Sequence, residues 1–218
     1  MRGPETSELE LTAPPMSFRE LVWSDYEVTL VDRDESPLVS KLLYLPRLLL
    51  NPSLQLAFLV RIAQKGPVVL LYPLRWLEVI IFSSEIHGFR GPGGIVMGPG
   101  IAFPHPWSII IGRGVEIGAG VTIYNNTNIG SDRHLPRTEL AQLPTPRLGD
   151  RSVIYAYSAI QGAWDVGHDA VVGIHVVLDE HVPPGALKTV RKLRSAGEWP
   201  GEQRPRQLRF TRNVAANH

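Results

Sequence analysis

The stretch IGRGVEIGAGVTIYNNTNIG, residues 111–130, carries an aliphatic residue at every sixth position. The same register resumes further along the chain, and the residues that keep it are Ile111, Ile117, Ile123, Ile129, Leu148, Ile154, Ile160, Val166, Val172 and Leu178. A six-residue period predicts a β-solenoid, in which each short strand forms one face of a triangular coil. Each aliphatic residue is expected to point inward and to stack on its counterpart in the next coil.

Residues 131–146 interrupt the period and are expected to form a loop that is extruded from the solenoid. Repeats of this kind are typical of the left-handed parallel β-helix, a known exception to the right-handed crossover rule. No helical pattern separates the expected strands, which excludes a doubly wound α/β fold. The sequence therefore predicts a mainly β protein, with a left-handed β-helix over residues 85–186.

The residues before the solenoid predict helices. Ser17 and Glu20 have the spacing of a capping box, and Asn51-Pro52 pairs a good N-cap residue with proline at the first helical position. A third helix is expected over about residues 68–81. The sequence thus predicts a small α-helical domain over residues 17–84, after a disordered segment at residues 1–16 that is rich in Pro, Glu and Thr.

Composition excludes several classes of function. The chain has no cysteine, which rules out disulfides, thiolate metal sites and cysteine nucleophiles. A net charge of +1 gives no global attraction to nucleic acid, although basic residues gather in the expected tail, residues 187–218. No signal-peptide pattern is present, and no apolar run approaches the roughly 20 residues that span a bilayer. We therefore expect a cytoplasmic protein with no membrane and no nucleic-acid partner.

An expected helical domain is followed by a solenoid that contains SIIIG, YNNTNIG and SDRH, and then by VPPGA. Over roughly residues 18–186, this order resembles that of the serine O-acetyltransferases. The resemblance implies transfer of an acetyl group from acetyl-CoA to a hydroxyl of L-serine or a related amino acid. It also implies general-base catalysis without a metal, in a homotrimer or a dimer of trimers whose sites lie between chains.

The resemblance also assigns roles to residues. His105 matches the family's catalytic histidine and is expected to act as general base, with Glu85 of an acidic-Ile-His segment as the group that orients it. His134, in Asp-Arg-His, is expected to contact the acceptor or the thioester. The residues implied in binding the acceptor are Arg133, Asp32 and Asp34. Those implied in binding coenzyme A are Ala156, Tyr157, Ser158, Lys188 and Arg191.

The sequence departs from the family at several of these places. Pro104 stands where the family has the aspartate that holds the amino group of serine, and about five extra residues separate Glu85 from His105. Residues 155–158 read Tyr-Ala-Tyr-Ser, where the family has a smooth Gly-Ala-Gly-Ala track for the donor.

Three alternatives follow from these departures and from the seven histidines of the chain. The acceptor hydroxyl could belong to a sugar, a polysaccharide or a secondary metabolite. The chain could be a metal-dependent hexapeptide protein that resembles the γ-type carbonic anhydrases, with His175 and His181 as its closest histidines. It could also be a scaffold that has kept the fold and lost the chemistry.

Overall fold

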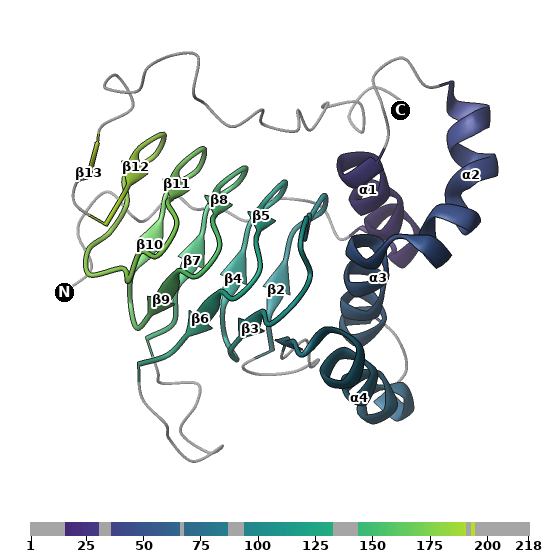
Figure 1. Cartoon of the computed structure of the whole chain (residues 1–218), viewed down its shortest axis with the longest axis horizontal. Coiled ribbons are helices and arrows are strands. Elements are labelled where there is room, and N and C mark those ends of the chain that lie inside the picture. Colours follow the sequence, from purple (N-terminus) through teal and green to yellow (C-terminus); the bar gives the residue numbers. More distant parts are fainter. Residues whose placement is uncertain are drawn as a thin grey trace.

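The computed structural model describes residues 16–30, 36–65, 68–86, 94–132, 144–190 and 193–194. A group of helices stands at one end of a solenoid of short parallel strands (Figure 1). The helices are α1 (Phe18–Leu30), α2 (Pro37–Leu50), α3 (Pro52–Lys65), the 3-10 turn η1 (Val68–Leu70) and α4 (Leu71–Phe82).

Local side-chain bonds explain where these helices begin. At α1 the amide of Glu20 donates to Ser17 Oγ (3.3 Å), and the amide of Ser17 donates back to Glu20 Oε2 (2.7 Å), so the expected capping box is confirmed. At α3 the amide of Leu54 donates to Asn51 Oδ1 (3.2 Å), which confirms the second expected start. The start of α2 was not predicted, and there Ser36 accepts from Val39 N (3.4 Å).

The strands form three sheets, one for each face of the coil. The first sheet has the order β1 (Glu85–Ile86), β3 (Ile110–Ile111), β6 (Asn128–Gly130) and β9 (Ala159–Gln161). The second has the order β2 (Val96–Met97), β4 (Glu116–Ile117), β7 (Arg147–Leu148) and β10 (Asp165–Val166). The third has the order β5 (Thr122–Ile123), β8 (Val153–Ile154), β11 (Val171–Val172), β12 (Leu187–Lys188) and β13 (Leu193–Arg194).

The six-residue register is confirmed at all ten positions. Every one of these aliphatic side chains is buried, with an exposed fraction of 4% or less. Their stacking follows the pairing of the strands: Ile111 pairs with Ile129, and Ile129 pairs with Ile160 in the next coil. A continuous column of branched side chains along each face therefore fills the interior, and the fold is a left-handed parallel β-helix preceded by helices.

The parallel ladder extends slightly beyond its expected end at residue 186. Leu187 and Lys188 of β12 pair in parallel with β11, and β12 then pairs antiparallel with β13. At the expected loop, β6 ends at Gly130 and β7 begins at Arg147, while residues 133–143 lie outside the described part of the chain.

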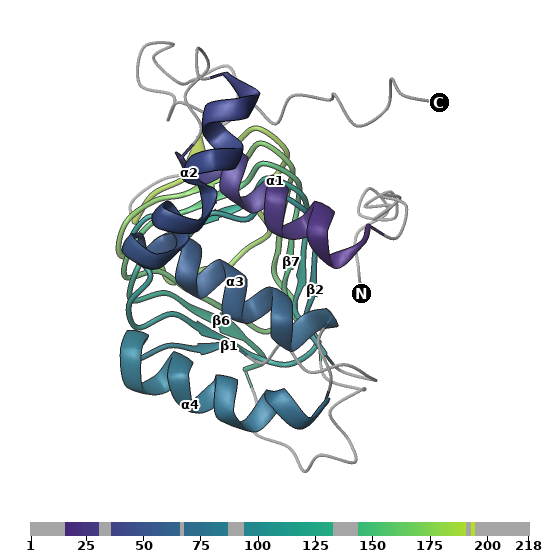
Figure 2. The same ribbon diagram turned by 90° about the vertical axis from the view of Figure 1, so that its right-hand side faces the viewer.

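The helices lie across one end of the solenoid (Figure 2). They are fixed to its first coil by buried polar contacts. Arg61 of α3, 1% exposed, donates from Nη1 to the carbonyl of Met97 (3.1 Å) and from Nη2 to that of Gly98 (2.6 Å). Asp25 of α1 accepts from the amide of Ile101 (2.9 Å). Helix side chains therefore satisfy three backbone groups of the first coil, those of Met97, Gly98 and Ile101.

Helix α2 leaves several of its leucines exposed. Leu38, Leu42, Leu45 and Leu49 are each more than 60% exposed, whereas Ser40 is its buried residue. Within the described part of the chain, no single helix is long and apolar enough to span a membrane. Helices α2 and α3 meet that criterion only as a pair, and they are bent by 92° at the break between them.

Candidate functional site

The candidate site lies on the corner at which the chain leaves the third sheet and enters the first. In successive coils this corner is formed by residues 103–108, 124–127, 155–158 and 173–176. We call the first of these segments, FPHPWS, the His105 loop. Because β5 pairs with β8 and β8 with β11, Tyr124, Tyr155 and Gly173 occupy equivalent places one coil apart.

Two serines form hydrogen bonds with the backbone of the His105 loop and the residue after it. Ser84 Oγ donates to the carbonyl of Pro106 (3.0 Å) and accepts from the amide of Ile109 (3.1 Å). Ser53, in the first turn of α3, donates to the carbonyl of Pro104 (3.3 Å). These contacts tie the loop to both α3 and the end of α4. Neither serine could be assigned to the site from the sequence, because each bond joins residues more than 20 positions apart.

The side chain of His105 is exposed, and its imidazole lies against a tyrosine. The ring centroids of His105 and Tyr124 are 6.0 Å apart, with the rings tilted by 53°. Tyr124 in turn stacks on Tyr155 at 5.0 Å and 18°. Among the described residues, none forms a hydrogen bond or ion pair with the imidazole.

Glu85, the expected partner of His105, has another contact. It lies in β1 beside Ile110 of β3, and the guanidinium of Arg75 on α4 donates to its Oε1. This ion pair is partly exposed, at 35% for Arg75 and 41% for Glu85. The orienting role of Glu85 stays a prediction, and on this geometry its carboxylate is already engaged by α4.

A second carboxyl group, on α4, lies close enough to this ion pair to feel both of its charges. Glu78 of α4 is 2% exposed, and its Oε2 has no hydrogen-bond partner among the described residues. Burial raises the pKa of Glu78 to about 8, with a smaller contribution from the charge of Glu85, against a hydrogen bond from the amide of Ile86 and the charge of Arg75. Glu78 is therefore mainly a neutral acid at pH 7, which sequence analysis did not foresee.

The three residues expected to line the donor track differ in how far their side chains are exposed to a ligand. Ser158 is buried, and its hydroxyl donates to the carbonyl of Tyr155. The carbonyl of Ala156 accepts from the amide of His175 (3.2 Å). Tyr157 is 52% exposed and stacks on the imidazole of His175 at 4.9 Å and 25°. Of these three, Tyr157 offers the larger outward-facing surface to a ligand.

Lys188, expected at the nucleotide end of coenzyme A, is paired within the chain. Its ammonium contacts Asp179 Oδ1 (2.8 Å) and the carboxylate of Glu180. Hydrogen bonds to these two acids raise the pKa of Lys188. A phosphate would have to compete with both carboxylates for this cation.

Five of the expected site residues lie outside the described residues, and their roles stay predictions. They are Asp32, Asp34, Arg133, His134 and Arg191.

The histidines considered for a metal have separate neighbours. His175 stacks on Tyr157, whereas His181 Nδ1 accepts from the amide of Asp165 (3.0 Å) and its ring meets Trp164 edge-on. In the described part of the chain, no group of three or more His, Cys, Asp or Glu residues is placed to hold a metal ion.

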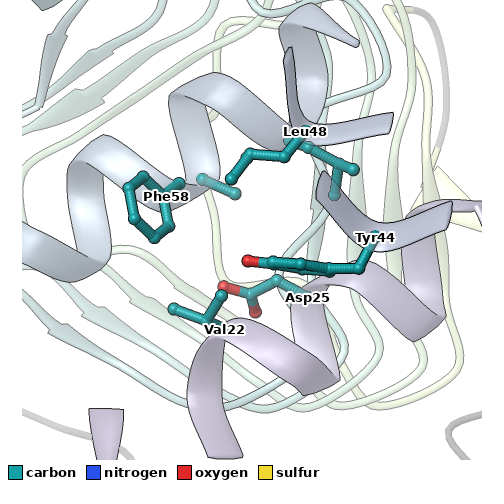
Figure 3. A pocket seen from close by; sticks show the side chains of 7 residues that line it. Val22, Asp25, Tyr44, Leu48 and Phe58 are labelled. Carbon is teal, nitrogen blue, oxygen red and sulfur yellow. The ribbon is translucent and has the colours of Figure 1, made fainter. Parts of the chain in front are cut away.

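A small pocket between α1, α2 and α3 is separate from the corner (Figure 3). Its lining residues are Val22, Asp25, Tyr44, Leu48, Leu54, Ala57 and Phe58. Burial raises the pKa of Tyr44, helped by the charge of Asp25, and the carboxylate of Asp25 is bound to Arg61. The polar groups of this pocket therefore serve the packing of the helices.

Comparison by sequence finds serine acetyltransferases. The chain is 30% identical to the enzyme of Mycobacterium tuberculosis (strain ATCC 25618 / H37Rv) over 130 residues, which are 57% of this chain and 50% of that protein. It is 30% identical to that of Helicobacter pylori (strain ATCC 700392 / 26695) over 122 residues, 56% of this chain and 66% of that protein. The chain thus spans half to two-thirds of the length of these relatives. No family model matches the chain.

Comparison by structure also finds serine acetyltransferases. Soybean serine acetyltransferase superposes with a TM-score of 0.60 at 24% identity, over 78% of this chain and 65% of that chain. The serine acetyltransferase of Brucella abortus strain S19 gives a TM-score of 0.54 at 15% identity, over 84% of each chain. At these identities the superpositions establish the fold alone. By both comparisons the chain is similar to serine acetyltransferases, in sequence over part of their length and in overall fold.

Proposed function

We propose that this chain transfers an acetyl group from acetyl-CoA to the hydroxyl of L-serine or a related amino acid, with His105 as general base. The observation that carries the proposal is the placement of His105. Its imidazole is exposed on a loop held by Ser53 and Ser84, in a solenoid similar to those of serine acetyltransferases.

The chemistry requires one base and no covalent enzyme intermediate. The imidazole removes the hydroxyl proton while the hydroxyl oxygen attacks the thioester carbon, which gives a tetrahedral oxyanion. Collapse of this intermediate breaks the carbon–sulfur bond, and the imidazolium returns its proton to the departing thiolate of coenzyme A. An imidazole suits both steps because its ordinary pKa lies near neutrality. Backbone amides of the tight turns are candidates for holding the oxyanion.

The choice of an amino acid acceptor rests on the relatives. Soybean and Neisseria gonorrhoeae serine acetyltransferases have been solved in complex with serine, and an Entamoeba histolytica isoform in complex with cysteine. By resemblance, Arg133 would bind the acceptor's carboxylate as a two-pronged donor, and Asp32 and Asp34 would meet its amino group.

We further propose a homotrimer whose chains meet at the corner that carries His105. Large apolar side chains are exposed on this corner, Trp107 at 45% and Ile174 at 55%, and along the adjoining first sheet, Ile110 at 41% and Val177 at 72%. Exposed apolar surface of this kind is suited to contact with another chain. A neighbouring chain would cover them and bring its own residues close to the imidazole.

A second acceptor class, a sugar hydroxyl, is favoured by two observations. Pro104 supplies no carboxylate for an amino group, and its carbonyl is bound by Ser53. The stacked pair of Tyr157 and His175 presents an exposed aromatic surface on the same corner. Aromatic rings with an apolar face and a polar edge are suited to such half-polar ligands.

The test is thiol release from acetyl-CoA with L-serine, L-homoserine, amino sugars and simple sugars as acceptors. Wild type is compared with His105→Ala and with His168→Ala, which removes an exposed histidine of a different corner. Release with L-serine that is lost only in His105→Ala supports the proposal. Release only with a sugar keeps the mechanism and reassigns the acceptor. Absence of release with every acceptor, together with no binding of coenzyme A, favours the inactive scaffold.

A further inference from the structure

A run of three aromatic rings crosses successive coils at the candidate site. It begins with the imidazole of His105, continues with Tyr124 at 6.0 Å and ends with Tyr155, stacked on Tyr124 at 5.0 Å. At the next equivalent place stands Gly173, which has no side chain. The run therefore ends at Tyr155, and His105 is the ring at its other end.

The backbone ladder sets the spacing of the two tyrosines. The amide of Tyr124 donates to the carbonyl of Ile154, and that of Tyr155 to the carbonyl of Val172, both at 2.9 Å. Neighbouring strands lie about 4.8 Å apart, so side chains with the same orientation on adjacent coils stack at nearly that distance. The two rings are thus held face to face by the fold itself.

The same kind of hydrogen bond forms in the turn after each tyrosine. Thr127 Oγ1 donates to the carbonyl of Tyr124 (2.6 Å), and the hydroxyl of Ser158 donates to that of Tyr155. Both hydroxyl residues are buried, at 1% exposure. The two tyrosines therefore have the same backbone setting, and their rings lie nearly parallel, at 18°.

The imidazole of a general base has to be held in a productive orientation. The imidazole of His105 forms no hydrogen bond or ion pair with any residue the structure describes, and the carboxylate of Glu85 is engaged by Arg75. Catalysis depends on holding the base within a fraction of an ångström of its productive place, since misplacement by about 1 Å can lower the rate about 100-fold. Packing against a fixed ring is the restraint that the described residues supply.

We propose that Tyr155, acting through Tyr124, is a positioning residue for His105. It buttresses the ring of Tyr124, which in turn limits the orientations of the imidazole. Burial raises the pKa of Tyr155, so its phenol stays neutral and serves as a packing surface. The inference rests on the proposed function for its effect on rate. Its effect on the imidazole itself is independent of that function.

The test compares Tyr155→Ala, which removes the buttress, with Tyr155→Phe, which keeps the ring. In Tyr155→Ala we expect kcat to fall about 10-fold or more, with KM for the acceptor within about two-fold. Tyr155→Phe is expected to retain kcat within about two-fold. Tyr72→Ala, which removes an exposed ring from α4, serves as the unaffected control.

The second readout is the NMR signal of the His105 imidazole, assigned by its disappearance in His105→Ala. In Tyr155→Ala we expect this signal to move toward the shift of an unpacked histidine, while Tyr155→Phe and Tyr157→Ala leave it in place. Tyr157 is a matched control for this signal because it lies in the same turn and stacks on His175. If Tyr155→Ala unfolds, Tyr155→Leu preserves apolar volume without a stacked ring.

Three outcomes of these experiments would uphold or overturn the role of Tyr155. An unmoved His105 signal in a folded Tyr155→Ala variant overturns the inference. A raised KM with unchanged kcat also overturns it, because Tyr155 would then act by binding ligand. If the His105 signal moves in Tyr155→Ala but the wild-type protein transfers no acetyl group, the packing relation is upheld and the proposed function is separately overturned.

Discussion

The guanidinium of Arg61 on α3 forms a two-pronged ion pair with the carboxylate of Asp25 on α1, with Nε–Oδ2 at 2.7 Å and Nη2–Oδ1 at 2.9 Å. Both side chains are buried, at 1% and 2% exposure. Each also binds backbone groups of the first coil, through Gly98 and Ile101. One pair of side chains therefore joins two helices to the end of the β-helix on which His105 is placed.

Removal of Arg61 should destabilise the protein strongly. Arg61→Met leaves a buried carboxylate without its partner, and breaking a buried pair from one side costs about 3–5 kcal/mol. The free energy of unfolding, measured by urea denaturation at pH 7 and fixed protein concentration, is expected to fall by this amount. Arg19→Met, at an exposed site of α1, should change it by less than about 0.5 kcal/mol. A loss below about 1 kcal/mol for Arg61→Met would contradict the structure.

Two neighbouring isoleucines of β3 should respond differently to the same change. Ile111 is fully buried in the column of the first sheet, whereas Ile110 is 41% exposed. Ile111→Ala should lower the free energy of unfolding by about 2–5 kcal/mol, because it removes buried methyl groups and leaves a cavity. Ile110→Ala should cost clearly less. Equal losses in urea titrations of the two variants would mean that the register of β3 is wrong.

Loss of the Ser84 hydroxyl should disturb the His105 loop. Ser84→Ala removes the bonds to Pro106 and Ile109, and leaving buried backbone groups unsatisfied costs about 1–3 kcal/mol. We expect a lower melting temperature and, if the proposed function holds, a fall in kcat for acetyl transfer. The matched control is Ser83→Ala, since Ser83 is the exposed neighbour. A full effect in Ser83→Ala and none in Ser84→Ala would reject this role.

Glu78 should make stability depend on pH. Its pKa is about 8 in the folded protein and near 4.5 in the unfolded chain. Below pH 4.5 both states hold the proton and Glu78 carries no penalty. Between pH 4.5 and 8 only the unfolded state releases it, so stability falls as pH rises, by roughly 1.4 kcal/mol per pH unit at most. Above pH 8 the penalty is constant.

The variant Glu78→Gln removes this titration. Its free energy of unfolding relative to wild type should therefore rise between pH 5 and pH 8, by on the order of 4 kcal/mol. Urea denaturation at pH 5, 6, 7 and 8 measures the difference. Glu27→Gln, at an exposed position of α1, should show no comparable trend. A difference that does not vary with pH would show that Glu78 is ionised in the folded protein.

Much of the fold was predictable because its causes are local. The inward residues recur at a fixed spacing, so Ile117 and Ile154 could be assigned to the core without knowledge of their neighbours. The caps at Ser17 and Asn51 involve residues three positions apart. The stack of Tyr124 on Tyr155 also had a signal, since each directly follows an inward isoleucine. Its relation to the candidate base could not be predicted, because it depends on the position of His105 beside Tyr124.

The rest of the site was not predictable from spacing. The ion pair of Glu85 with Arg75 depends on how α4 packs beside β1, and the bonds of Ser84 depend on the path of the His105 loop. No periodic pattern relates these residues, because each contact joins segments of different type.

The sequence by itself determined that this chain is a β-helix with helices before it, and which side chains fill its interior. A six-residue repeat has that power because every coil meets the same environment, so a local pattern dictates burial throughout. Only the tertiary structure decided how the helices meet the first coil, which carboxyl group is buried, and what lies against His105. Those outcomes depend on desolvation and packing between distant segments, which no local pattern encodes.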